Sequence, residues 1–313
     1  MISYITRRLI LIVPVLIGVS ILAFLMTVLA PGDPAAIMAG PQASQSDIEN
    51  LRIKLNLDKP LHIRYFTFLK GILTFDLGQS VQSQKPVSQM LLTRYPNTLV
   101  LATSSMIIAT LVGLIAGIIS GVKQYSIFDY TSMFVALIGI SFPTFWIGLV
   151  LMYIFSVELR ILPVSGLPAE WWTIDGLRHL ILPAITLGVY SAALIARMTR
   201  SSILDILQND YIRTAKAKGV KGKRIVFKHI LKNAFIPVIT VIGLNFGRLL
   251  AGTVITESVF GINGIGRLAV RAINTRDFPV VQGCVLMIAF TFVFINLIVD
   301  ILYAFLDPRI SYS

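Results

Sequence analysis

A cluster of basic side chains lies between residues 197 and 233. It holds ten of the 27 Lys and Arg residues in the chain, and its only acidic residues are Asp205 and Asp210. Such a cluster can lie against anionic lipid or dock a partner protein. Its basic members are Arg197, Arg200, Arg213, Lys216, Lys218, Lys221, Lys223, Arg224, Lys228 and Lys232.

Two further charged residues occur at an apolar segment. Arg248 falls inside the apolar run 234–256, and Glu257 follows this run directly. A charge at membrane depth usually faces a cavity or a partner group. Arg248 is therefore expected either to tie helices together, through a carbonyl or Glu257, or to line a pathway and meet an anionic solute.

Motifs for catalysis or cofactor binding are absent from the sequence. Residues 261–268 have the glycine spacing of a P-loop, but Arg267 and Leu268 replace its Lys and Ser/Thr. Gly264, Gly266 and Ala269 mimic a dinucleotide fingerprint without the strand of a βαβ unit. The three histidines are scattered and Cys284 is the single cysteine, so no metal-ligand spacing arises. We expect no catalytic residue, no metal, no cofactor and no ATP hydrolysis by this chain.

Composition places the chain in a membrane. Of its 313 residues 56% are hydrophobic and 13% charged, whereas soluble domains carry roughly 25% charged residues. The net charge of +12 comes largely from the basic cluster, and no nucleic-acid-binding motif accompanies it. We therefore expect a lipid bilayer, and no nucleic acid, as the partner of this surface.

Six apolar runs are long enough to span a bilayer, and they predict an all-α membrane protein. A short loop as basic as 197–233 stays in the cytoplasm, so both termini are expected there too. The chain then divides into residues 1–30 with the first span, an extracytoplasmic segment 31–97, and a core 98–313 that contains the basic cluster. The expected spans are 9–30, 98–122, 130–157, 180–196, 234–256 and 278–299.

Local patterns add detail to this outline. In segment 31–97, Ser46 and Glu49 resemble a capping box that begins a helix over 46–57. Residues 65–77 are amphipathic and are expected to lie on the membrane surface. Gly113, Gly117 and Gly121 recur every four residues, which predicts a close contact with another helix.

The middle of the basic cluster resembles the EAA loop of ABC-importer permeases, in which a short helix fits a groove on the ATPase subunit. Residues 214–217 stand where the family's Glu-Ala-Ala usually falls, Gly219 matches the family glycine, and Ile236-Pro237 matches its closing pair. The Glu of the general motif is missing. The sequence of residues 213–219, Arg-Thr-Ala-Lys-Ala-Lys-Gly, is nevertheless similar to the form of this motif in the permeases for dipeptides, oligopeptides, glutathione and nickel. The resemblance assigns ATPase coupling to Arg213, Thr214, Ala215, Lys216, Ala217, Lys218, Gly219 and Val220.

Further landmarks extend this resemblance over nearly the whole chain. They are Asp76-Leu77-Gly78-Gln79-Ser80, residues 257–260, 264–269 and 276–283, and Asp307-Pro308-Arg309. The resemblance implies a type I permease fold with a second homologous permease, two cytoplasmic ATPase subunits and an external solute-binding protein. It implies di- or oligopeptide cargo first, with nickel, a nickel chelate or glutathione as alternatives, in a bacterial or archaeal cytoplasmic membrane.

Two other function classes fit a polytopic membrane protein. A stand-alone secondary transporter often shows inverted repeats, and an intramembrane enzyme needs paired reactive groups at membrane depth. Neither pattern is visible here. Co-purification of an ATPase distinguishes the importer subunit from both.

Overall fold

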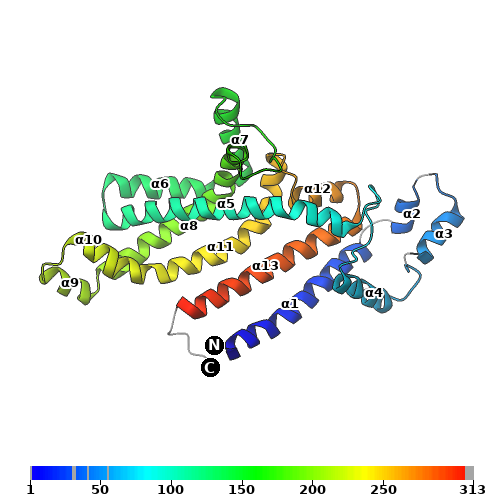
Figure 1. Cartoon of the computed structure of the whole chain (residues 1–313), viewed down its shortest axis with the longest axis horizontal. Helices are drawn as coiled ribbons and strands as arrows, with labels where there is room; N and C mark the ends of the chain where they lie inside the picture. Colours follow the sequence, from blue (N-terminus) through cyan, green and yellow to red (C-terminus); the bar gives the residue numbers. More distant parts are fainter. Residues whose placement is uncertain (1, 30–32, 41, 55, 307–313) are drawn as a thin grey trace.

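Long helices dominate the computed structural model, which describes residues 2–29, 33–40, 42–54 and 56–306. Five of them carry an apolar stretch long enough to cross a membrane: α1 (Ile2–Val28), α5 (Val87–Val122), α8 (Ile174–Leu207), α11 (Leu231–Val259) and α13 (Phe278–Leu306). They run side by side along the long dimension of the molecule (Figure 1). The only β pairing in the described ranges is an isolated bridge between Gln79 and Pro86, so the all-α membrane class is confirmed.

The expected span 130–157 is not one straight helix. It consists of α6 (Ile127–Ser141), α7 (Thr144–Met152) and the π-helical segment η1 (Tyr153–Glu158), with a bend of 109°. The break falls at Phe142, which adopts an extended conformation because the residue before a proline is pushed out of the helical region. The chain still reaches the opposite end of the bundle, since Gly166 N donates to Phe260 O just beyond α11. Counted as one broken span, this segment brings the number of crossings to six.

The glycine stripe of α5 packs closely against another helix, as predicted, and the structure shows that this helix is α8. A Cβ atom on Gly117 would lie 2.6 Å from the backbone oxygen of Ala196, and one on Gly113 would lie 2.7 Å from that of Ala192. Any side chain larger than hydrogen would push the two backbones apart.

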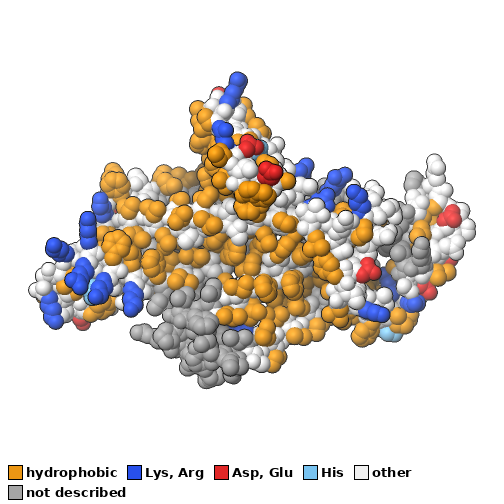
Figure 2. Space-filling view, viewed as in Figure 1, with side chains coloured by type: hydrophobic (Ala, Val, Ile, Leu, Met, Phe, Trp, Pro, Cys, Tyr) orange, Lys and Arg blue, Asp and Glu red, His pale blue; other side chains and the backbone are white. Residues whose placement is uncertain are grey.

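The two ends of the bundle differ in character. At one end lie α9 (Asp210–Ala217), α10 (Gly222–Arg224) and the π-helical segment η2 (Ile225–Ile230); at the other lie α2 (Pro34–Ala39), α3 (Gln45–Lys54), α4 (Leu61–Thr74) and α12 (Ile265–Asn274). Figure 2 shows Lys and Arg side chains gathered at the α9 end and apolar side chains along the middle. Arg8 pairs with Asp300 at 2.8 Å, and both line a cavity with Arg197 of α8. The start of α1 and the end of α13 therefore lie toward the α9 end.

Several boundaries differ from the sequence-based expectation. Helix α8 continues to Leu207, because Thr199, Ser202 and Ile203 face the core and extend its buried side into the basic cluster. The expected outer loop after Glu257 contains α12, an amphipathic helix with Leu268 and Ala272 buried.

The predicted capping box and the landmark at residues 307–309 remain to be compared with the structure. The capping box of α3 is formed by Ser44 and Asp47 rather than Ser46 and Glu49: Asp47 N donates to Ser44 Oγ at 3.2 Å, and Ser44 N to Asp47 Oδ2 at 3.1 Å. Arg52 donates to Asp33 and lowers the pKa of that carboxyl, tying α3 to the start of α2. The landmark Asp307-Pro308-Arg309 lies outside the described residues.

Gly117→Val should loosen the bundle, because the new side chain meets Ala196 O and Thr199 of α8. Overpacking of this kind costs about 1–3 kcal/mol. Gly18→Val in α1 is the matched control, since nothing lies within 4 Å of its Cβ position. The unfolding temperature of the purified protein in detergent should fall for Gly117→Val only; equal stability of the two variants would contradict the close contact.

Candidate functional site

Helix α9 ends in a glycine-dependent turn. Gly219 has φ of +74°, a conformation that costs other residues about 1–2 kcal/mol. Its N–H donates to Lys216 O at 3.0 Å, and Val220 N donates to Ala215 O at 3.2 Å. This is a Schellman motif, which closes a helix and satisfies its last carbonyls. The glycine of the resemblance is thus required by the backbone itself.

One face of α9 is anchored to the bundle. Ile212 is fully buried and packs with Ile203 of α8 and with Ile225 and Ile230 of η2. Ala215 and Val220 are partly buried against the same cluster. Of the residues that the resemblance assigns to ATPase coupling, Ala215 and Val220 therefore face the core.

The other face of α9 is exposed. It presents Arg213, Thr214, Lys216, Ala217 and Lys218. The ion pair of Arg213 with Asp210 is long, 3.9 Å, and almost fully exposed, so it contributes little stability. The neighbouring segment adds Phe227, which is 72% exposed. Sequence reasoning missed this residue; an aromatic side chain in a strongly basic segment is the signal that could have found it.

A buried ion pair holds three helices together near α9, and it too was missed. The guanidinium of Arg200 donates to both oxygens of Asp129, at 2.6 and 2.8 Å. Asp129 also accepts from Ser120 Oγ and, at 3.0 Å, from Tyr125 N. The carboxylate is 2% exposed. This clamp joins the end of α5, the start of α6 and the last turns of α8, directly before α9.

Arg248 lines a cavity of about 820 Å³ between α1, α8, α11 and α13. Three more arginines line it: Arg8, which pairs with Asp300, Arg200, which pairs with Asp129, and Arg197. The side chain of Arg248 is exposed, and no residue in the described part of the chain hydrogen-bonds or pairs with it. Its guanidinium is free to meet an anion.

Glu257 joins α11 to α5 and α12, and Arg248 is not among its hydrogen-bond partners. It is fully buried and accepts from Thr98 Oγ1 at 2.7 Å and from Arg267 N at 2.9 Å. Gly264 and Gly266 leave space for its carboxylate, because a Cβ on either would collide with α11 or with Glu257 itself. Glu257 thus caps the N-terminus of α12, and the proposed tie to Arg248 is wrong.

Two family descriptions match the chain. Residues 113–312 match the family described as "Binding-protein-dependent transport system inner membrane component", and residues 1–102 match the corresponding N-terminal family. The chain is 44% identical, over the full length of both, to the dipeptide transport system permease protein DppB of Alkalihalophilus pseudofirmus. It is likewise 44% identical, over full length, to the glutathione transport system permease protein GsiC of Escherichia coli.

Solved structures share the fold at low sequence identity. The MetNI methionine ABC transporter in an inward-facing conformation aligns with a TM-score of 0.57 at 18% identity, over 70% of this chain and 97% of that one. An amino acid ABC transporter crystallised with histidines gives 0.53 at 17% identity, over 71% and 95%. The type I importer fold expected from the sequence is therefore confirmed.

Arg200→Gln should destabilise the protein, because it leaves the Asp129 carboxylate buried without its countercharge. Breaking a buried pair in this way costs about 3–5 kcal/mol. Arg197→Gln is the matched control, one turn earlier on α8 with an exposed side chain. Denaturant unfolding in detergent should separate the two variants, and adding Asp129→Asn should restore part of the loss. Equal midpoints for Arg200→Gln and Arg197→Gln would argue against the clamp.

Proposed function

This chain belongs to the family of binding-protein-dependent transport system inner membrane components, and we propose that it forms half of the pathway of an ATP-driven importer of di- and oligopeptides. It is a multi-pass membrane permease subunit and not an enzyme. The peptide cargo is supported by the full-length similarity to a dipeptide permease. Glutathione, itself a peptide, is the second candidate because other full-length relatives are permeases for it.

The partners follow from the family. ATP hydrolysis is assigned to two cytoplasmic ATPase subunits, solute delivery to an external binding protein, and the other half of the pathway to a second homologous permease. We place α9 and both termini in the cytoplasm and residues 31–97 outside, in a bacterial or archaeal cytoplasmic membrane. The charge asymmetry of Figure 2 supports this orientation.

The observation that carries the coupling role is the two-sided character of α9. Its exposed face offers Ala217, basic side chains and, from the adjoining segment, Phe227 to a partner. Its buried face is packed through Ile212 onto α8 and η2. A force on α9 therefore reaches α8 directly and α11 through η2. Both helices line the Arg248 cavity, so ATPase movement can alter the pathway.

Arg248 is assigned to the pathway. Its guanidinium faces a cavity with Arg197, and the carboxylates found near the cavity, Asp129 and Asp300, are already paired. An excess of positive charge attracts the carboxylate of a peptide.

Ala217→Trp should abolish coupling while leaving the permease folded, because the bulky ring lies on the exposed face of α9. The measurement is the amount of ATPase that co-purifies, with membrane abundance as the check on folding. A variant with Lys221, Lys223 and Arg224 changed to Gln is the comparison, since a purely lipid-bound loop depends on those charges. Full ATPase retention in Ala217→Trp, with loss only in the charge variant, would refute docking through α9.

Arg248→Gln should lower the apparent affinity for a dipeptide with a free carboxylate by roughly 10- to 100-fold, the strength of one charge-assisted hydrogen bond. Arg248→Lys should lose less, because it keeps the charge but not the planar fork. ATP-driven uptake into proteoliposomes measures this, with co-purified ATPase as the control for assembly. Unchanged uptake by Arg248→Gln would remove Arg248 from the pathway.

A further inference from the structure

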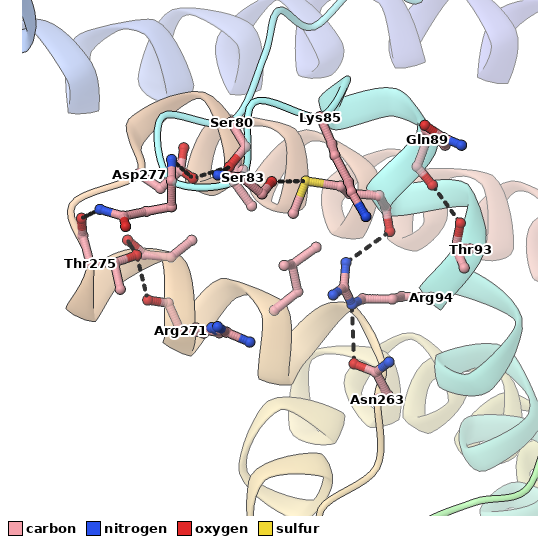
Figure 3. A pocket seen from close by; sticks show the side chains of 15 residues that line it. Ser80, Ser83, Lys85, Gln89, Thr93, Arg94, Asn263, Arg271, Thr275 and Asp277 are labelled. Atoms are coloured by element: carbon pink, nitrogen blue, oxygen red, sulfur yellow. Dashed lines mark hydrogen bonds between the residues drawn. The ribbon is translucent and has the colours of Figure 1, made fainter. Parts of the chain in front are cut away.

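A second polar cavity lies at the end of the bundle opposite α9. It measures about 460 Å³ and is enclosed by the turn around 80–85, the first turns of α5, and α12 with the turn that follows it (Figure 3). Three positively charged side chains line it: Lys85, Arg94 and Arg271. They come from three different elements, so the fold brings the charges together.

The one carboxylate that lines this cavity is already hydrogen-bonded. Asp277 is 3% exposed. It accepts from Ser80 Oγ at 2.6 Å, Val81 N at 3.1 Å and Gln82 N at 3.4 Å, so it serves to hold the turn. Within the described ranges, no acidic side chain forms an ion pair with Lys85, Arg94 or Arg271. With three cations against the one carboxylate of Asp277, the cavity lining carries a net positive charge.

Arg94 is held in a fixed orientation. Its Nε donates to Asn263 Oδ1 at 3.1 Å and its Nη1 to Met90 O at 3.4 Å. The backbone of Asn263 is held in turn, because its main-chain carbonyl accepts from Asn97 Nδ2 at 3.1 Å. The remaining N–H groups of Arg94 stay available. A guanidinium held in this way is suited to the planar geometry of a carboxylate.

The rest of the lining suits a small organic ligand. Met90, Leu268 and Val280 supply apolar surface, and Gln89, Thr93 and Thr275 supply neutral polar groups. The volume falls in the usual range for small-molecule pockets, roughly 300–1,000 Å³. A small acid with an apolar body matches this combination better than an inorganic anion does.

We propose that this cavity binds the carboxylate of the incoming solute at the outer face, before the solute reaches the membrane-embedded pathway. The inference rests on the proposed function for the direction of transport and the peptide class. A lipid phosphate shares the anionic chemistry, so the test must separate the two sources.

The test measures equilibrium binding of alanyl-phenylalanine and of its C-terminal amide to the assembled transporter in neutral-lipid nanodiscs, without ATP. Arg271→Gln is the main variant, because this side chain is exposed and unpaired among the described residues; Lys85→Gln, in the exposed turn, is the second. Arg276→Gln is the matched control, since Arg276 is exposed nearby but does not line this cavity.

We expect Arg271→Gln to weaken binding of the free acid about tenfold or more, Lys85→Gln to weaken it in the same sense, and Arg276→Gln to leave it within about twofold. The amide should bind weakly and alike to every variant. Three results would each overturn the proposal. They are an equal loss of affinity for the acid and the amide, a loss of affinity in Arg276→Gln as large as in Arg271→Gln, and displacement of the peptide by phosphatidylglycerol in the disc. Uptake of the same dipeptide by the wild-type transporter tests the proposed function separately, whatever the binding result.

Discussion

The close packing of α5 on α8 is the constraint on which the rest of the structure depends. The glycine stripe allows the two backbones to touch, and the Asp129–Arg200 clamp holds the ends nearest α9 together with α6. Helix α8 also packs against α7 and α11. It continues past the clamp to Leu207 and leads into α9. Because only Gln208 and Asn209 separate α8 from α9, a displacement of α9 moves a helix that touches most of the bundle.

Charged residues in this chain divide into two groups. The buried acids Asp129, Glu257 and Asp277 are each saturated by hydrogen bonds and hold a helix end or a turn in place. Arg248 and Arg271 instead face cavities at different depths and have no partner among the described residues. Burying a charge is costly unless it is paired or hydrogen-bonded. The buried acids therefore fix the positions of the helix ends and turns that bind them, whereas the unpaired arginines remain available for a solute.

The apolar run lengths were sufficient to predict the all-helical class and six crossings, because the thickness of the bilayer sets the length of a spanning helix. The glycine spacing predicted the tight contact but not its partner, α8. The pairing of Asp129 with Arg200 joins residues far apart in the chain, and no local pattern encodes it. The direction of the bend at Phe142 depends on tertiary packing. So does the burial of Ala215 against the core. The resemblance assigned Gly219 to ATPase coupling, whereas its positive φ shows that the turn itself needs a glycine there.

The central claim is that the exposed face of α9 contacts an ATPase subunit. Cysteine cross-linking in the assembled transporter tests it directly, since the native Cys284 is buried. A photoactivatable reagent on Ala217→Cys should link this chain to an ATPase subunit. The same reagent on Gln45→Cys, exposed at the opposite end of the bundle, should not. A cross-link from Ala217→Cys to lipid alone, with the ATPase present and active, would contradict the account.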